Sequence, residues 1–329
     1  MPTDRLRLIN HLHASDDLPD RVRVGLTSSP KHLPVKLFYD DLGSALFDAI
    51  CRLPEYYVAR AESEVLEANA KDIVREFCSD ARLVELGSGS SSKTRILLNA
   101  ITAREPRLTY VPVDINALTL RAVSQSLVQE YAELQVTAVA GDFERPDEIL
   151  ESVLEGDDTQ RTLVLFLGST IGNLEPSASV EMLRRLYRVL RPGDGLLLGT
   201  DLDKDESILI PAYDDSLRVT AAFNLNLLVR MNRDFGATFA LNDYRHMVRY
   251  DRQARRIEMH LVSQTDHRVR LEGLQASIDF GAGETIHTES SYKFDADSVV
   301  SLARDAGFEV QHRWCDARGY FAESLLRRT

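Results

Sequence analysis

The sequence predicts an α/β fold with a doubly wound sheet, a helical N-terminal segment and an inserted, smaller α+β domain. From about residue 81 to residue 200, apolar strand-like runs alternate regularly with helical patterns, as in a parallel sheet covered on both faces. After residue 200 the alternation changes to a period of two, which indicates a smaller antiparallel sheet. A helix and a strand then return after Phe294, so the second domain is expected to interrupt the first.

The N-terminal region is expected to be helical up to about residue 80. Apolar residues stand at helical spacing in 46–50, and 62–77 alternates acids with apolar residues. Pro54 interrupts the helical pattern between them, in an aromatic segment that includes Tyr56 and Tyr57. We therefore place the domain boundaries at 1–60 for the helical segment, 61–200 plus 295–329 for the sheet domain, and 201–294 for the smaller domain.

A loop with two glycines follows the first expected strand. The run Leu83–Leu86 opens into Gly87-Ser88-Gly89, and a lysine-bearing segment then leads into a helical pattern. A strand, a tight turn and a helix N-terminus in this order present backbone N–H groups to the anionic end of a ligand. Ser92 stands where the dinucleotide fingerprint has its third glycine, which disfavours a pyrophosphate and hence a nicotinamide dehydrogenase. A nucleoside cofactor without pyrophosphate fits better, and S-adenosylmethionine is the candidate.

Acidic residues follow the next two expected strands. The strand 108–113 ends in Asp114, which is placed to accept hydrogen bonds from ribose hydroxyls. The strand 135–140 leads into Asp142 and Phe143, which suit an adenine: the carboxylate accepts from the exocyclic amine and the ring offers a stacking surface. Each acid alone fits a helix cap or a turn equally well, but their order at successive strand ends favours a cofactor site.

A continuously apolar run, 163–167, is typical of a strand buried on both faces. It opens into Gly168 and then Asn173, at the strand end where open α/β sheets bind ligands. The smaller domain is expected to contain a helix at 219–231 and strands at 256–262 and 269–271. The last part of the chain is expected to form a helix at 296–306, a strand at 309–313 and an edge strand at 321–326.

The composition and charge of the chain indicate which kinds of molecule it binds. The formal charge is −12, and no basic run supplies the footprint that binding to nucleic acid requires. No run approaches the roughly 18 apolar residues of a membrane span, and the N-terminus lacks an apolar signal core. We expect a cytoplasmic monomer that acts on a small molecule, without nucleic acid or membrane. Cys51, Cys78 and Cys315 and the eight scattered histidines predict neither disulfides nor a metal site.

With these segments in place, the chain resembles the bacterial L-histidine Nα-methyltransferases, which form the histidine betaine hercynine in the first step of ergothioneine biosynthesis. The resemblance covers nearly the whole chain and implies a class I, Rossmann-like S-adenosylmethionine-dependent methyltransferase whose residues 1–60 contribute to the substrate pocket. The matching blocks are 30–40, 43–48, 53–57, 84–94, 166–174, 199–201, 212–215, 256–259 and 288–294. Residues 58–61 and Ser91-Ser92 depart from the family's usual pattern, but no expected ligand contact lies there.

The resemblance also implies roles for individual residues. The expected cofactor contacts are Gly87, Lys93, Asp114, Asp142 and Phe143. The expected amino-acid pocket contains Tyr56, Asn173, Tyr213, Glu289 and Ser291, with Met259 as an apolar wall. The residues expected around the reacting nitrogen are Tyr39, Phe47 and Gly168.

These roles have a chemical rationale. Glu289 and Ser291 are two apart, so on a strand they share a face. Glu289 would accept from one imidazole N–H, while Ser291 and Tyr56 would serve the other ring nitrogen. The Asn173 amide and the Tyr213 hydroxyl would donate to the substrate carboxylate.

Tyr39 would orient the amine while its proton leaves through water. Phe47 would attract the growing ammonium cation by about 0.5–2 kcal/mol.

Two alternatives remain open at this stage. One is that the same fold serves another aromatic amino acid, such as a tryptophan derivative, although an indole has less use for a carboxylate beside Met259. The chain could instead bind a cofactor without catalysis, but such a protein would not need Tyr39, Phe47, Asn173 and Glu289 together.

Overall fold

The computed structural model describes residues 5–12, 17–76, 81–104, 107–154 and 160–328. These residues divide into two units. The first comprises Met1–Leu12, Val58–Asp203 and Lys293–Thr329, and the second comprises His13–Tyr57 and Lys204–Tyr292. The domain boundaries expected from the sequence stay a prediction. Phe77 and Cys78 lie outside the described residues.

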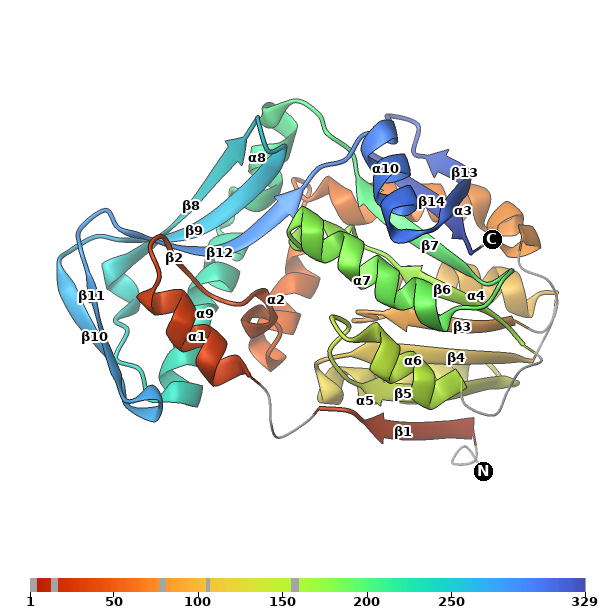
Figure 1. Cartoon of the computed structure of the whole chain (residues 1–329), viewed down its shortest axis with the longest axis horizontal. Helices are drawn as coiled ribbons and strands as arrows, with labels where there is room; N and C mark the ends of the chain where they lie inside the picture. The colour runs from red at the N-terminus through yellow and green to blue at the C-terminus, as the bar shows by residue number, and fades with distance from the viewer. Residues whose placement is uncertain (1–4, 13–16, 77–80, 105–106, 155–159, 329) are drawn as a thin grey trace. The chain divides into compact units, whose positions relative to one another are not determined.

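The first unit is built on an eight-stranded sheet with the order β1-β5-β4-β3-β6-β7-β14-β13 (Figure 1). Its strands are β1 (Leu6–Asn10), β3 (Ala81–Leu86), β4 (Leu108–Asp114), β5 (Leu134–Ala140), β6 (Arg161–Phe166), β7 (Gly195–Asp201), β13 (Glu309–Cys315) and β14 (Phe321–Arg327). The strands from β1 to β7 in this order are parallel, and β14 and β13 are antiparallel additions. The predicted doubly wound α/β fold is confirmed.

The strand order reverses at β3. The chain runs from β3 outward to β4 and β5, and it returns to place β6 on the other side of β3. The carboxyl ends of β3 and β6 therefore flank a topological switch point, where open α/β sheets form their ligand crevice. The two-glycine loop follows β3 and the Gly168 turn follows β6, so both lie at this point.

Helices cover both faces of this sheet. One apolar cluster joins α6 (Pro146–Leu154), α7 (Pro176–Val189) and α10 (Ala296–Ala306) to Val84 and Leu86 of β3. The other joins α3 (Tyr57–Glu76), α4 (Thr94–Thr102) and α5 (Ala117–Glu130) to Leu83. Because side chains alternate along a strand, buried residues on both faces produce the continuous apolar runs seen in the sequence.

Two expectations about this sheet were wrong. Residues 6–10 form the edge strand β1 rather than a helix, paired parallel to β5. This segment is too short to show a clear periodicity of apolar residues, so the sequence did not reveal the strand. Hydrogen bonds to β5 hold it in the sheet, and the neighbouring Arg5 guanidinium donates to the carbonyls of Val128 and Tyr131 at 2.6 Å. Residues 321–326 do not form the edge either: β14 lies between β7 and β13. Its side chains are buried while many of those on β13 are exposed.

The second unit contains a four-stranded sheet with the order β2-β12-β9-β8 and a two-stranded ribbon, β10-β11. The strands are β2 (Lys31–His32), β8 (Tyr244–Asp251), β9 (Arg256–Ser263), β10 (His267–Leu271), β11 (Ala276–Phe280) and β12 (Thr285–Tyr292). The helices are α1 (Leu18–Thr27), α2 (Asp41–Ile50), α8 (Glu206–Tyr213) and α9 (Val219–Phe235). The predicted helix at 219–231 and the antiparallel strands at 256–262 and 269–271 are confirmed.

Candidate cofactor and amino-acid sites

The two-glycine loop is fastened to the end of β4. Gly87 and Gly89 have φ angles of 71° and 48°, a region that glycine enters without a side-chain penalty. The N–H groups of Gly87 and Ser88 donate to the carbonyl of Val113 at 2.9 and 3.0 Å. The N–H of Gly89 donates to Oδ2 of Asp114 at 2.8 Å. The loop and the Asp114 carboxylate therefore lie together at the carboxyl edge of the sheet.

The Asp114 residue is half-buried at the end of β4. Burial raises its pKa, and the hydrogen bonds from the N–H groups of Asn116 and Gly89 act in the opposite direction. Both oxygens accept a backbone hydrogen bond, Oδ1 from Asn116 and Oδ2 from Gly89. Because a carboxylate has about four lone-pair positions, each oxygen retains capacity to accept from a ribose hydroxyl.

Phe143 completes a surface beside the loop. Carbon atoms of its ring lie 3.8 and 3.9 Å from the position that a Cβ at Gly87 would take. Its centroid lies 5.6 Å from that of Phe166 on β6, which orients the ring. Asp142 accepts from the N–H of Glu144 at 2.9 Å in the turn after β5. Gly87, Asp114 and Phe143 are thus brought together, and an aromatic ring beside carboxylate acceptors fits an adenosine moiety.

Lys93 immediately precedes α4, and its ammonium pairs with the carboxylate of Glu62 on α3. Glu62 also accepts from the N–H of Gly168 at 2.5 Å, and Gly168 has a φ of 73°. Sequence analysis missed Glu62, although a signal was present: Val58, Val65 and Leu66 place it on the apolar stripe of its helix. Asn173 ends the short helix η3 (Thr170–Asn173), and its side chain is partly buried.

Aromatic side chains of the second unit lie in one cluster. Phe47 packs edge-on against Tyr39 and Tyr56, with ring centroids 6.0 and 6.2 Å apart. Tyr56 in turn packs edge-on against Tyr213 at 6.2 Å. Phe223 of α9, which sequence analysis missed, lies 6.0 Å from Phe47 and 6.3 Å from Tyr39. Its only signal was an apolar position in an expected helix, which does not distinguish a site residue from a core residue.

Polar groups meet this cluster from β12. Glu289 and Ser291 are buried, and the Ser291 hydroxyl lies 2.8 Å from the hydroxyl of Tyr213. Met259 of β9 is the sheet partner of Glu289 and is also buried. Burial raises the pKa of Tyr56 well above its usual range, with further contributions from nearby Tyr213 and Glu289. Tyr56 therefore remains protonated, able to donate a hydrogen bond.

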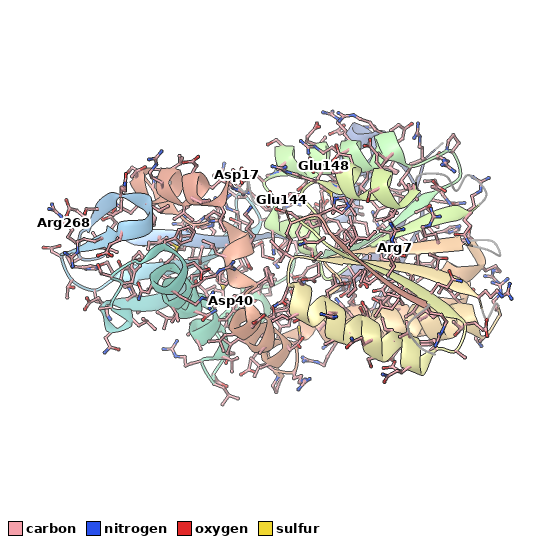
Figure 2. All side chains as sticks on the ribbon, turned by 90° about the horizontal axis from the view of Figure 1, so that it is seen from below. Arg7, Asp17, Asp40, Glu144, Glu148 and Arg268 are labelled. Carbon is pink, nitrogen blue, oxygen red and sulfur yellow. The ribbon has the colours of Figure 1, made fainter. Side chains whose placement is uncertain are left out.

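Asp40, labelled in Figure 2, fixes the start of α2. Its Oδ1 accepts from the N–H of Gly43 and from Nδ2 of Asn226, each at 2.8 Å. Its Oδ2 pairs with the guanidinium of Arg233 at 2.9 Å. Because Asn226 and Arg233 belong to α9, this carboxylate links α2, which carries Phe47, to α9, which carries Phe223.

The described residues contain no group of three or more His, Cys, Asp or Glu side chains able to hold a metal ion. Among the same residues, no helix combines the length and the apolar character needed to cross a membrane.

The family to which the chain belongs follows from comparison with known proteins. The family described as "Histidine-specific methyltransferase, SAM-dependent" matches residues 18–328. The chain belongs to this family. The family is dependent on S-adenosylmethionine, so S-adenosylmethionine is the methyl donor, as the two-glycine loop predicted.

Individual proteins and solved structures are also similar to this chain. The Histidine N-alpha-methyltransferase of Mycolicibacterium smegmatis is 44% identical, over 98% of this chain and 99% of that protein. Ergothioneine biosynthesis protein 1 of Schizosaccharomyces pombe is 32% identical, over 67% of this chain and 29% of that protein. Among solved structures, the CcbJ methyltransferase from Streptomyces caelestis covers 80% of this chain and 95% of its own, with 15% identity and a TM-score of 0.45.

Proposed function

We infer that the protein transfers three methyl groups from S-adenosylmethionine to the α-amino nitrogen of L-histidine, giving hercynine, the first step of ergothioneine biosynthesis. Membership of the histidine-specific family supports the reaction class. The observation that carries the choice of substrate is the buried carboxylate of Glu289, which shares β12 with Ser291 at the edge of an aromatic cluster.

A buried carboxylate suits an imidazole. A carboxylate shielded from water is costly unless a donor satisfies it, and an imidazole N–H is such a donor. Ser291 and Tyr56 can donate to or accept from the second ring nitrogen. An indole has one N–H and no second ring nitrogen, so it would offer nothing for Ser291 or Tyr56 to bind at that position. The tryptophan-type alternative is therefore less well supported than histidine.

The first unit supplies the cofactor surface. We propose that Gly87, Lys93, Asp114, Asp142 and Phe143 bind S-adenosylmethionine, with Asp114 accepting from the ribose and Phe143 stacking on the adenine. Bound S-adenosylmethionine supplies a methyl group on a positively charged sulfur, whose C–S bond breaks as the new C–N bond forms. Gly168 and Asn173, at the end of β6, belong to this unit as well.

The second unit supplies groups for the amine. The substrate nitrogen must lose a proton before each transfer, because only a lone pair can attack. We propose that Tyr39 orients the nitrogen by hydrogen bonding and that the proton leaves to water. Phe47 offers a ring face to the cation that forms, an attraction of about 0.5–2 kcal/mol.

Mass spectrometry of the purified protein with S-adenosylmethionine and each standard amino acid tests this function. The expected result is a mass increase of three methyl-for-hydrogen replacements on histidine alone. Nα-acetylhistidine, which keeps the imidazole and blocks the amine, is the control that must stay unmodified. Methylation of tryptophan in preference to histidine would overturn the substrate assignment and favour the alternative.

A further inference from the structure

A buried pair of carboxyl groups lies beside Lys93. The side chains of Glu62 on α3 and Glu323 on β14 are both 0% exposed. Glu62 pairs with the Lys93 ammonium and accepts from the Gly168 N–H. Among the described residues, no donor hydrogen-bonds to either oxygen of an ionised Glu323. The cluster thus holds two buried carboxyl groups beside one partly exposed ammonium.

Charge balance assigns one proton to this pair. Two carboxylates against one ammonium would leave a buried negative charge unpaired, which is strongly unfavourable. Burial and the neighbouring Glu62 raise the pKa of Glu323 well above its usual range. A protonated Glu323 can donate to Glu62, which gives its hydroxyl a partner. Glu62 meanwhile keeps its pair with Lys93.

The surrounding strands leave room for this arrangement. A Cβ at Gly199 on β7 would lie 2.8 Å from Oε1 of Glu62 and 3.1 Å from Oε1 of Glu323, so a side chain there would displace the pair. Glu85 on β3 is the other acid within electrostatic range of Lys93 and Glu62. Burial raises the pKa of Glu85 to about 7, and its oxygens accept from Thr94 and Tyr110.

We propose that Glu62 and Glu323 form a proton-sharing pair that positions Lys93 and the Gly168 turn for binding S-adenosylmethionine. Lys93 ends the loop after β3, and Gly168 begins the turn after β6. One carboxylate therefore holds the segments that follow both strands of the switch point. Glu62 and Glu323 are positioning residues, and the inference rests on the proposed cofactor role of Lys93.

Calorimetric titration of S-adenosylmethionine into two isosteric variants tests the pair. Glu62→Gln removes the anion that holds Lys93, so its Kd is expected to rise about tenfold or more. Glu323→Gln keeps an N–H donor toward Glu62, so its Kd at neutral pH is expected to change much less. Glu181→Gln removes an exposed negative charge on α7 and serves as the control for net charge. Wild-type affinity in Glu62→Gln, or a larger loss in Glu323→Gln than in Glu62→Gln, would overturn the proposal.

The pH profile of binding separates proton sharing from a purely structural role. A raised folded-state pKa means that the contribution of Glu323 is present at lower pH and is lost as pH rises through that pKa. Affinity of the wild type should therefore fall at alkaline pH, and Glu323→Gln should reduce that fall. Equal losses of affinity at alkaline pH in the wild type and Glu323→Gln would overturn the proposal. Because this comparison does not use Glu62→Gln, it tests the proposal even where that variant does not fold.

The two proposals fail in different ways. If the wild type binds S-adenosylmethionine and methylates histidine while the Glu62 and Glu323 variants behave contrary to expectation, only the positioning role is wrong. If the wild type binds S-adenosylmethionine but does not methylate histidine, only the substrate assignment is wrong. If the wild type does not bind S-adenosylmethionine, both proposals are wrong.

Discussion

The hydroxyl of Tyr213 lies 2.8 Å from the hydroxyl of Ser291, and both side chains are buried. Each hydroxyl has one proton to donate and can accept as well. If Ser291 donates to Tyr213, Tyr213 is the hydroxyl that would donate to a substrate carboxylate. If Tyr213 donates to Ser291, Ser291 is the hydroxyl that would donate to an imidazole nitrogen. The two residues therefore act on the substrate as one unit.

We predict that Tyr213→Phe and Ser291→Ala are coupled. Each change should raise the KM for histidine several-fold, because a net hydrogen bond is worth about 0.5–1.5 kcal/mol. The double variant should lose less than the sum of the single losses, since either change already breaks the shared bond. Steady-state kinetics of the four proteins measure this cycle. Strictly additive losses would show that the two hydroxyls act separately.

A second prediction concerns Glu289. Glu289→Ala should lower kcat/KM for histidine by about a hundredfold or more, because the imidazole N–H loses its buried acceptor. The Kd for S-adenosylmethionine should stay close to the wild-type value, since the proposed cofactor residues lie in the first unit. Glu289→Gln keeps a carbonyl acceptor without the charge, so its kcat/KM for histidine should lie between those of the wild type and Glu289→Ala. Parallel losses in histidine turnover and cofactor binding would indicate misfolding instead.

The site residues that could be predicted from the sequence are those marked by residues next to them in the chain. Gly87, Asp114 and Phe143 each follow a strand with a clear apolar run, and parallel strands bring their carboxyl ends to one edge of the sheet. Their proximity could therefore be predicted without knowing how the chain packs. Glu289 and Ser291 lie on strand β12, where their spacing of two residues puts them on one face, but only the resemblance marked them as pocket residues.

The rest depended on long-range packing. Glu62 and Glu323 are far apart in sequence, and only the insertion of β14 between β7 and β13 brings them together. Residues 321–326 were expected to form an edge strand, and a carboxyl group on an edge strand is expected to be exposed to solvent. Phe223 is likewise one apolar residue among several on α9. Only its packing against Phe47 and Tyr39 distinguishes it from a core residue.

A third prediction concerns the stability of the aromatic cluster. Asp40→Ala should destabilise the protein by about 1–2 kcal/mol, because it removes the N-cap of α2 together with the bonds from Asn226 and Arg233. Urea unfolding measures this loss. Asp279→Ala, which breaks the exposed pair with Arg268, is the matched control and should cost much less stability than Asp40→Ala. Equal costs would mean that Asp40 contributes no more than a surface charge.

The fourth prediction concerns acid stability. Burial and the nearby His260 lower the pKa of His287 from 6.5 to about 4. Above pH 6.5 the ring is neutral in both the folded and the unfolded chain, so His287 contributes no pH dependence there. Between pH 6.5 and about pH 4, His287 binds a proton in the unfolded chain but stays neutral in the folded chain. Stability should therefore fall as pH falls through this window.

His287→Gln tests this source of acid sensitivity. Glutamine does not titrate and can still bond to Ser290, whose hydroxyl lies 3.0 Å from Nε2 of His287. The variant should lose less free energy of unfolding than the wild type between about pH 7 and about pH 5, measured by urea unfolding at each pH. His312→Gln, on the exposed edge strand β13, is the control and should follow the wild type. His246 and His260 also have pKa values lowered by burial. His287→Gln should therefore reduce the loss of unfolding free energy at acid pH without abolishing it. An unchanged loss would exclude His287 as a contributor.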